Sequence, residues 1–398
     1  MNNLKYWIWF TQSIGYCTTK AKQLTFLYDS IEEFYKGGEQ EWRFSGLFSD
    51  KEIENMSNTP LTAADEIIHK CNIHYYDLIC LDSPEYPKCL FDIDDPPAVL
   101  YISGMLPDID DRMSIAVIGT RKASMYGIKS SYNFGYNLAK AGVTVVSGGA
   151  LGVDCSSHMG ALAADGVTIC VLGCGINYDY LRENAKMRSD ITYKGAVISE
   201  YPPDTEAYGY HFPQRNRIIS ALSDGVLVIE AGSKSGSLIT VSRALEQDAS
   251  KKIFALAGPV DSHFDGSNML VKNKVATLVT DYTDIIDAFD DIYVTSELDC
   301  AVRTLDEVVD VIPIKGKAPT DINGLKTNDL TEVPVHKDNL NLTEDESAVY
   351  YAIGFEPVHI DKISELVNLP VFKVLPILTT LELRKLIKCV QGRSYRLI

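Results

Sequence analysis

The sequence has 398 residues, of which 46% are hydrophobic, and its formal net charge at pH 7 is −17. A chain of this length suits about two to four domains, and none of its apolar runs approaches the roughly 18 residues that a membrane-spanning helix needs. The first residues lack the pattern of a signal peptide, so we expect a cytoplasmic protein without membrane association. The nine cysteines show no CxxC pair and no metal-ligand spacing, which predicts free thiols and no metal site.

The charge is unevenly distributed along the chain. From Arg112 to Thr280 there are 17 Lys and Arg against 14 Asp and Glu, a net charge of +3, so the remainder carries −20. Because phosphate binding needs local positive potential, the middle segment is where we expect an anion site. The acidic clusters at 92–95 and 108–111 are interpreted as solvated surface.

The first 75 residues contain few patterns that indicate a function. Residues 1–75 are predicted to form short helices, one of which begins near Thr62. Residues 76–111 contain several prolines and then the apolar run Val99–Ile102. This run predicts a strand that leads into the next domain.

Residues 112–290 alternate apolar runs with helical patterns. The runs are typical of buried strands and occur at 115–118, 143–146, 168–172, 195–198, 226–229 and 253–256. Helical patterns lie between most of them, for example at 128–141 and 238–247. Continuous apolar strands separated by helices predict an α/β, Rossmann-like fold with a mostly parallel sheet and helices on both faces.

The last hundred residues divide into two parts. Residues 291–341 are polar, with scattered Pro and Gly, and are interpreted as a linker. Residues 342–398 are predicted to form a small winged helix-turn-helix domain, with helices at 362–367 and from Val371 to about Lys388, and a wing at 394–397. The predicted domains are therefore 1–75 (helical), 76–290 (Rossmann-like), 291–341 (linker) and 342–398 (winged helix).

Glycine and small polar residues follow nearly every predicted strand of the middle domain. They include Gly119, Ser147, Gly148, Gly149, Gly173, Gly175, Gly232 and Gly258. The carboxyl ends of parallel strands share one edge of the sheet, and open α/β sheets bind ligands in the crevice there. Any single glycine is equally well explained as an ordinary turn residue, but their joint occurrence predicts a crevice.

The segment Phe212–Ile219 is the most specific feature of the middle domain. Pro213 is typical of the first turn of a helix, and Arg215 and Arg217 follow in the same turn, where the helix dipole disfavours cations. A bound phosphate backbone removes that conflict, since Arg offers bidentate contacts to phosphate. The alternative is that both arginines pair with nearby carboxylates.

Two further segments add to the same edge of the sheet. Lys234, Ser235, Gly236 and Ser237 precede a helix and have the composition of an anion-binding nest, although simple N-capping explains them equally well. Arg121 and Lys122 follow the first strand, and Phe212, Tyr178 and Tyr180 are candidates for base stacking. Buried aromatic residues are the simpler explanation of those rings.

Evidence for catalysis is weak. Asp154 and His158 share a helix face, which is better explained as a helix-supporting pair than as a catalytic one. Glu200 and Glu230 lie near strand ends, where one of them is a candidate general base. Neither GxGxxG nor GxxxxGK[ST] occurs, so we expect no cofactor.

Taken together, these segments resemble the DprA/Smf family. The matching pieces are Gly119–Ser124 with Gly127, Ser147–Asp154, Ser157–His158, Arg182–Asn184, Ser199–Pro203, Phe212–Ile219, Glu230–Ala231, Ser235–Thr240 and Gly266–Asn268. The ordered set spans about residues 80–285, and residues 342–398 resemble the winged-helix domain that many members carry. Three positions depart from the family pattern: Leu151 replaces an arginine, Leu181 a proline, and Ala257 the proline of a Pro-Gly pair.

The resemblance implies a non-enzymatic protein that binds and protects single-stranded DNA, forms a homodimer and helps to load the RecA recombinase in natural transformation. It implies that Arg121, Arg215, Asn216 and Arg217 contact the DNA backbone. The full set of expected DNA-binding residues is Arg121, Lys122, Ser124, Ser147, Gly148, Gly149, Arg182, Phe212, Arg215, Asn216, Arg217, Lys234, Ser235, Gly236 and Ser237.

Two other functions remain open from the sequence. One is a nucleotide-processing enzyme of the lysine-decarboxylase-like phosphoribohydrolase type, whose PGGxGTxxE motif has only a partial counterpart at 232–239, without the glutamate. The other is a duplex-binding regulator that uses residues 342–398. The mixed charge of that segment makes a protein–protein role equally plausible.

Overall fold

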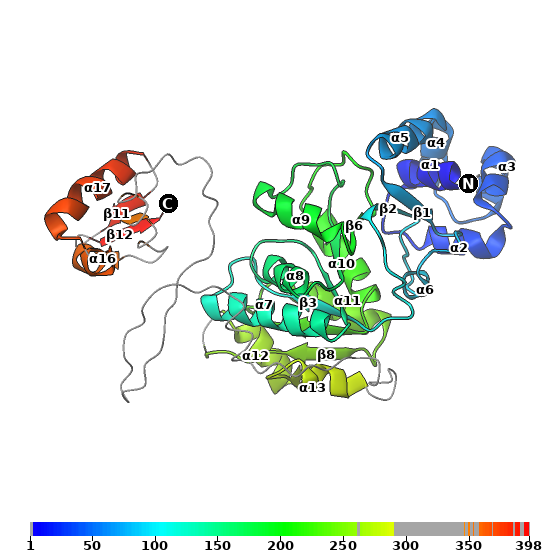
Figure 1. The fold of residues 1–398 in the computed structure, drawn as a ribbon. Helices are drawn as coiled ribbons and strands as arrows, with labels where there is room; N and C mark the ends of the chain where they lie inside the picture. Colours follow the sequence, from blue (N-terminus) through cyan, green and yellow to red (C-terminus); the bar gives the residue numbers. More distant parts are fainter. Residues whose placement is uncertain are drawn as a thin grey trace. The chain divides into compact units, whose positions relative to one another are not determined.

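The computed structural model describes residues 3–260, 263–289, 346, 349–350, 353, 358–367, 369–384, 387–390 and 394–397. The chain folds as two compact units, Met1–Val309 and Asp310–Ile398, both drawn in Figure 1. The linker expected at 291–341 lies outside the described residues, and the division into four domains stays a prediction. No helix in the described ranges is long and apolar enough to cross a membrane.

The first unit begins with the predicted group of short helices. These are α1 (Leu4–Ile14), α2 (Lys20–Leu27), α3 (Ile31–Phe44), α4 (Asp50–Asn58) and α5 (Thr62–Ile73). Ser49 and Glu52 form a capping box that starts α4, because each side chain satisfies a backbone amide that the first turn leaves unpaired. Trp7 and Trp9 of α1 are at most 1% exposed, so α1 forms the centre of this helical group.

A nine-stranded sheet follows. Its strands are β1 (Asp77–Cys80), β2 (Val99–Gly104), β3 (Ser114–Ile118), β4 (Thr144–Ser147), β5 (Thr168–Leu172), β6 (Ala196–Ser199), β7 (Gly225–Val228), β8 (Lys252–Ala255) and β9 (Thr277–Leu278). Their order is β1-β2-β6-β5-β4-β3-β7-β8-β9. All neighbours from β6 to β9 pair in parallel, whereas β2 pairs antiparallel with both β1 and β6.

Helices cover both faces of this sheet (Figure 1). They are α6 (Lys88–Phe91), α7 (Met125–Lys140), α8 (Val153–Ala163), η1 (Arg182–Asn184), α9 (Ala185–Ile191), α10 (His211–Ala221), α11 (Leu238–Gln247), α12 (Asp265–Lys272), α13 (Thr283–Ile286) and η2 (Asp287–Phe289). Successive strand residues point to opposite faces, so Ile115 and Val117 of β3 pack with Leu138 of α7, while Ala116 packs with Ile218 of α10. The predicted fold class is confirmed.

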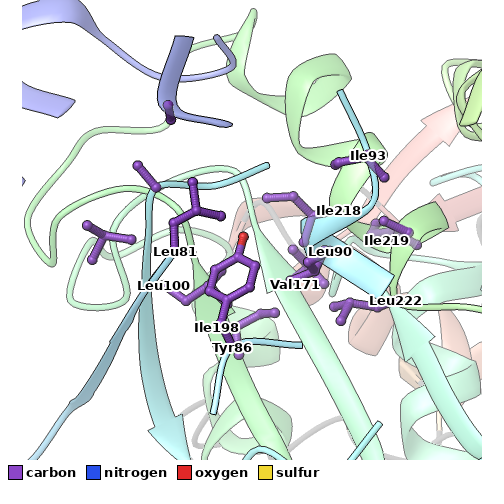
Figure 2. Packing of buried hydrophobic residues seen from close by; sticks show 14 of the residues in the cluster. Leu81, Tyr86, Leu90, Ile93, Leu100, Val171, Ile198, Ile218, Ile219 and Leu222 are labelled. Carbon is purple, nitrogen blue, oxygen red and sulfur yellow. The ribbon is translucent and has the colours of Figure 1, made fainter. Parts of the chain in front are cut away.

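Figure 2 shows the core between the sheet and α10, where Val171 of β5 and Ile198 of β6 lie near Ile218 and Leu222. All four side chains are at most 1% exposed. Burying such a side chain contributes roughly 1.5–3 kcal/mol relative to leaving it in water. The helix that carries Phe212, Arg215 and Arg217 is therefore fixed against the sheet by its apolar face.

The strand order contains one reversal. From β3 the chain proceeds outward through β4, β5 and β6, then returns through α10 to β7 on the other side of β3. In open α/β sheets the connections on the two sides of such a reversal diverge and leave a crevice at the carboxyl ends of the strands. The crevice therefore lies at the ends of β3 and β7, next to the glycines at 119 and 232.

Strands β1 and β9 were not predicted from the sequence. The side chains of β1 range from exposed to buried, and both residues of β9 are exposed, so neither strand has the continuous apolar run that reveals a central strand. Both lie at the edges of the sheet. Their pairing is thus set by the neighbouring strand rather than by their own composition.

The second unit contains β10 (Val358–His359), α16 (Ile360–Val367), α17 (Val371–Leu383), β11 (Ile387–Val390) and β12 (Ser394–Leu397), with the strands in the order β10-β12-β11. The two helices and the wing strand at 394–397 agree with the prediction. The expected extension of the second helix to Lys388 is wrong. Ile387 is fully buried and Lys388 is exposed, so this segment follows the two-residue period of a strand.

Helices α7 and α8 approach each other closely through two glycines. A Cβ on Gly160 would lie 2.1 Å from the carbonyl oxygen of Tyr132, and one on Gly135 would lie 2.3 Å from that of Ser157. Neither backbone oxygen can move without shifting its helix. The packing of α7 on α8 therefore requires glycine at both positions.

We expect Gly160→Ala to lower the free energy of unfolding by about 1–3 kcal/mol, because the added methyl group forces two packed helices apart. Urea unfolding followed by circular dichroism measures the change. Gly209→Ala is the matched control, since a Cβ there meets nothing within 4 Å. Equal stability of the two variants would contradict the proposed close packing.

Candidate functional site

The loop after β3 is held in place by Glu230, which follows β7. The Ser124 hydroxyl donates to the Glu230 carboxylate at 2.7 Å, and the Ser124 amide donates to it at 3.0 Å. The Thr120 amide donates to the Glu230 backbone oxygen at 2.8 Å. Glu230 is fully buried, whereas Arg121 and Lys122 are exposed. Hydrogen bonds to Glu230 at the end of β7 thus fix the loop after β3, which carries the exposed Arg121 and Lys122.

The loop after β4 packs against Arg215. A Cβ on Gly148 would lie 1.9 Å from Nη1 of Arg215, so glycine is required for the guanidinium to fit beneath this backbone. Gly149 has φ +65°, and a Cβ there would lie 2.5 Å from Sγ of Cys170. Both glycines shape the floor of the crevice.

Arg215 is a buried cation without a carboxylate partner. Its side chain is 4% exposed and its Nη1 donates to the carbonyl of Val171 at 2.6 Å. Its Nε has no hydrogen-bond partner among the residues that the structure describes. Burial lowers the pKa of Arg215, and the charge of Asp154 acts in the opposite direction. A buried charge with unsatisfied donors is costly unless a ligand compensates it.

Phe212 connects this buried cation to the exposed one. Its ring centroid lies 5.2 Å from Cζ of Arg121 and 6.0 Å from Cζ of Arg215. The Tyr180 ring lies 5.2 Å from the Phe212 ring. We call Arg121, Phe212, Arg215 and Tyr180 the arginine–aromatic cluster. Neither of its guanidiniums forms a salt bridge within the described part of the chain, although the nearby charge of Asp154 acts on Arg215, so the cluster is a site of positive charge without a bonded carboxylate.

Arg217 lies on the other side of α10. Its Nη2 is 2.5 Å from Oε1 of Glu200 and its Nε is 3.1 Å from Oδ2 of Asp95. Although burial lowers the pKa of Arg217, Glu200 and Asp95 raise it overall. The side chain is 1% exposed, so it offers no surface to a phosphate. The contact with a DNA backbone that was expected for Arg217 is incompatible with this burial. Arg217 pairs with carboxylates instead, which was the alternative interpretation of the sequence.

The difference between the two arginines follows from helix geometry. Each residue turns about 100° around the helix axis, so two positions apart the side chains differ by about 200°. Arg215 therefore points toward the crevice at Gly148, while Arg217 points toward Glu200 and Asp95. Arg215 of α10 thus faces the crevice, whereas Arg217 anchors the helix.

Asp95 was not predicted to have a structural role. The sequence analysis placed the acidic clusters at the solvated surface, but Asp95 pairs with Arg217 and accepts from Sγ of Cys17 at 3.1 Å. The amide of Cys17 also donates to Glu200 at 3.4 Å. Asp110, from the second cluster, accepts from the amides of residues 88 and 89. The Arg217 network therefore joins α10 to the loop after α1.

The remaining expected residues fall into two groups. In the loop before α11, Lys234 and Gly236 are exposed, Ser235 and Ser237 share a 2.8 Å hydrogen bond, and Asn216 donates to the Gly236 carbonyl at 3.5 Å. This loop is thereby held beside α10. The loop at 234–237 thus forms a second segment of the crevice edge, and its Lys234 side chain is exposed.

The second group lies outside the arginine–aromatic cluster. Ser147 is fully buried and donates to the carbonyl of Val117 at 2.6 Å, while Ser124 accepts from the amide of Gly127 and so caps α7. Arg182 is exposed and paired with Asp179. None of these three side chains belongs to the arginine–aromatic cluster.

Two departures from the family pattern are visible at the crevice. Leu151 is 39% exposed, so an apolar side chain occupies a position where the family has a cation. Leu181 has φ 50°, a left-handed conformation that is uncommon for a residue other than glycine. Its carbonyl accepts from Nη1 of Arg188 at 3.2 Å, which holds the turn before η1 in place.

The side chains considered as catalytic groups form structural contacts instead. His158 is fully buried, its Nδ1 lies 2.7 Å from the hydroxyl of Thr168, and burial lowers its pKa to about 3. Its hydrogen bond goes to the sheet, while the Asp154 carboxylate accepts from the amide of Ala150. Glu200 and Glu230 hold Arg217 and Ser124. No cluster of three or more His, Cys, Asp or Glu suited to a metal occurs in the described ranges.

A family model described as DNA recombination-mediator protein A matches residues 77–290 of this chain, which include the whole crevice. The chain belongs to this family. A second model, the DprA winged helix domain, matches residues 334–393. The two models together cover the Rossmann-like sheet and the winged-helix unit.

Relatives and a solved structure agree with this assignment. Protein Smf of Escherichia coli is 42% identical over 212 residues, which are 53% of this chain and 56% of that protein. The DNA processing protein DprA of Bacillus subtilis is 36% identical over 52% of this chain and 70% of its own length. The crystal structure of DprA from Streptococcus pneumoniae superposes with a TM-score of 0.61 at 30% identity, covering 71% of this chain and 97% of that one. The chain thus matches little more than half the length of the E. coli relative.

We expect Arg217→Met to lower the free energy of unfolding by about 3–5 kcal/mol, because it leaves Glu200 buried without its partner. Adding Glu200→Met removes the orphaned charge and restores part of the loss. Urea titrations of the single and double variants measure both effects.

Arg243→Met serves as the control, since Arg243 forms an exposed pair with Glu246 that is worth at most about 1 kcal/mol. If Arg217→Met and Arg243→Met cost the same, the Arg217 network is not an anchor of α10.

Proposed function

We propose that this protein binds single-stranded DNA in the crevice at the ends of β3 and β7 and acts as a recombination mediator. The observation that carries the proposal is the arginine–aromatic cluster, in which two cations contact one phenylalanine ring without a carboxylate partner among the described residues. A phosphate at Arg121 compensates both charges. The Phe212 and Tyr180 rings offer faces to unstacked bases.

The proposed contact surface is smaller than the set expected from sequence. Arg121, Lys122 and Lys234 are exposed and suited to phosphate contact, while Arg215 contributes from beneath Gly148. Arg217 is left out because of its burial. Gly148 and Gly149 let the strand approach the backbone closely.

The same geometry favours a binding role over a nucleotide-processing enzyme. Such an enzyme needs a carboxylate that is free to act as a general base. Glu200 pairs with Arg217, and Glu230 accepts from Ser124. We therefore propose that the protein is not an enzyme and needs no cofactor.

Its wider role follows from the family. Members are described as recombination mediators, and we propose that this chain acts in the cytoplasm as a homodimer that protects incoming single-stranded DNA and helps to load the RecA recombinase in natural transformation. The family name supports a recombinase partner. Purified RecA and strand-exchange assays test this part directly.

We expect wild-type protein to bind labelled oligo-dT with an affinity that falls steeply with salt, and Arg121→Gln to weaken it. Losing one phosphate contact reduces the slope of log K against log salt by about 0.7 for a single strand. Fluorescence anisotropy across a salt series measures both quantities. Lys140→Gln is the matched control, because Lys140 is exposed at the far end of α7. An unchanged slope for Arg121→Gln removes Arg121 from the site.

The second unit gives a separate prediction. Lys373 is exposed near the start of α17, where a helix-turn-helix contacts duplex DNA. Because we place single-strand binding in the first unit, Lys373→Glu leaves oligo-dT affinity unchanged in the full chain. A parallel titration with duplex DNA reveals whether α17 reads a duplex. Loss of oligo-dT binding in Lys373→Glu would contradict this division of roles.

A further inference from the structure

Two exposed tyrosines lie directly before α10. Tyr208 is 45% exposed and Tyr210 is 62% exposed. Their rings are nearly parallel, with centroids 5.7 Å apart and planes 12° from each other. Single exposed aromatic residues are common on protein surfaces, but two rings placed side by side form a small apolar patch of the kind that binding sites use.

The pair rests on a rigid aromatic base. The buried His211 ring meets Tyr208 at 5.4 Å and Tyr210 at 4.5 Å, both edge to face. On its other side His211 stacks on Tyr201 at 3.9 Å, and Tyr201 packs edge to face on Tyr16 at 4.8 Å. The amide of His211 also donates to the carbonyl of Tyr208 at 3.0 Å. The exposed rings are therefore held in place before any ligand arrives, which reduces the entropic cost of binding.

The position of the pair links it to the crevice. His211 is the first residue of α10, and Phe212 of the arginine–aromatic cluster is the next. Tyr210 is thus two residues from the ring that contacts Arg121 and Arg215. A strand that leaves the cluster past the beginning of α10 meets the two tyrosines.

The charges around the pair disfavour phosphate. Glu206 raises the pKa of Tyr208, with smaller contributions from burial and from Tyr210 and Tyr178, so the Tyr208 phenol stays neutral near pH 7. Asp204 lies close in sequence and pairs with Lys70. Neutral ring faces beside carboxylates suit uncharged nucleobases rather than the DNA backbone.

We propose that Tyr208 and Tyr210 form a base-stacking platform that extends the single-strand path beyond the arginine–aromatic cluster. This inference rests on the proposed function, since the cluster supplies the phosphate contacts and the platform the base contacts. A duplex keeps its base faces stacked inside the helix, so the platform is available to single strands alone. It therefore determines the preference for single-stranded over duplex DNA.

The test compares two labelled oligonucleotides of equal length, oligo-dT and a strand of abasic sites, by anisotropy at one low salt concentration. For the full chain with Tyr208→Ala and Tyr210→Ala, we expect oligo-dT affinity to fall on the order of tenfold or more, because base stacking on aromatic rings has that magnitude. Affinity for the abasic strand stays at the wild-type value. Phenylalanine at both positions retains oligo-dT binding, since the ring faces remain.

Tyr193→Ala is the matched control, because Tyr193 is 80% exposed between α9 and β6, at the amino end of β6 and therefore away from the carboxyl ends that form the crevice. Wild-type affinity of the double alanine variant for oligo-dT overturns the platform and leaves the proposed function intact. An equal loss on both probes also overturns it, because that loss reflects the backbone site. If the wild type binds neither probe, the proposed function fails and the platform fails with it.

Discussion

The salt bridge between Arg217 and Glu200, supported by Asp95, is the interaction on which the candidate site depends. A cation that is 1% exposed is tolerated only when carboxylates compensate it, so α10 cannot rotate without breaking this network. That restriction fixes where the opposite side of the helix points. Arg215 reaches Gly148 and Phe212 reaches Arg121 because Arg217 is held on the other side.

The candidate site is consequently arranged before a ligand binds. Glu230 fixes the loop that carries Arg121, and the glycines at 148 and 149 fit closely around Arg215 and Cys170. Such a site has little conformational entropy left to lose on binding. Burial lowers the pKa of Arg215, with a smaller contribution from repulsion by Arg121, and an anion relieves that repulsion. The proposed contacts with the DNA backbone would give affinity without base sequence preference.

The sequence predicted the central fold well because continuous apolar runs and glycine-ended strands are local features. The strand at 168–172 and the helix at 238–247 agree with the structure to the residue. The edge strands β1 and β9 were missed because they depend on neighbours rather than on their own composition.

The site was predicted only in part for a different reason. Its residue types were recognisable, but which of Arg215 and Arg217 faces the crevice depends on how α10 is seated against the sheet. Asp95 contacts Arg217 and Cys17 contacts Glu200 across more than a hundred residues of sequence, and no local pattern reveals such pairs. The stacked rings of Tyr208 and Tyr210 were likewise invisible, because their exposure is a property of the folded loop.

The contact of Cys17 with Glu200 has a consequence for how the chain folds during synthesis. Helices α1 to α5 leave the ribosome long before Glu200 and Arg217 are made. At roughly 5–20 residues per second, the loop after α1 waits on the order of 10–40 s for its partners. In that interval the helical group relies on its own aromatic centre, in which Trp9 packs on Trp42. The first helices can pack on β1 and β2 early, but the contacts of Cys17 with Glu200 and of Asp95 with Arg217 form only when β6 and α10 have been made.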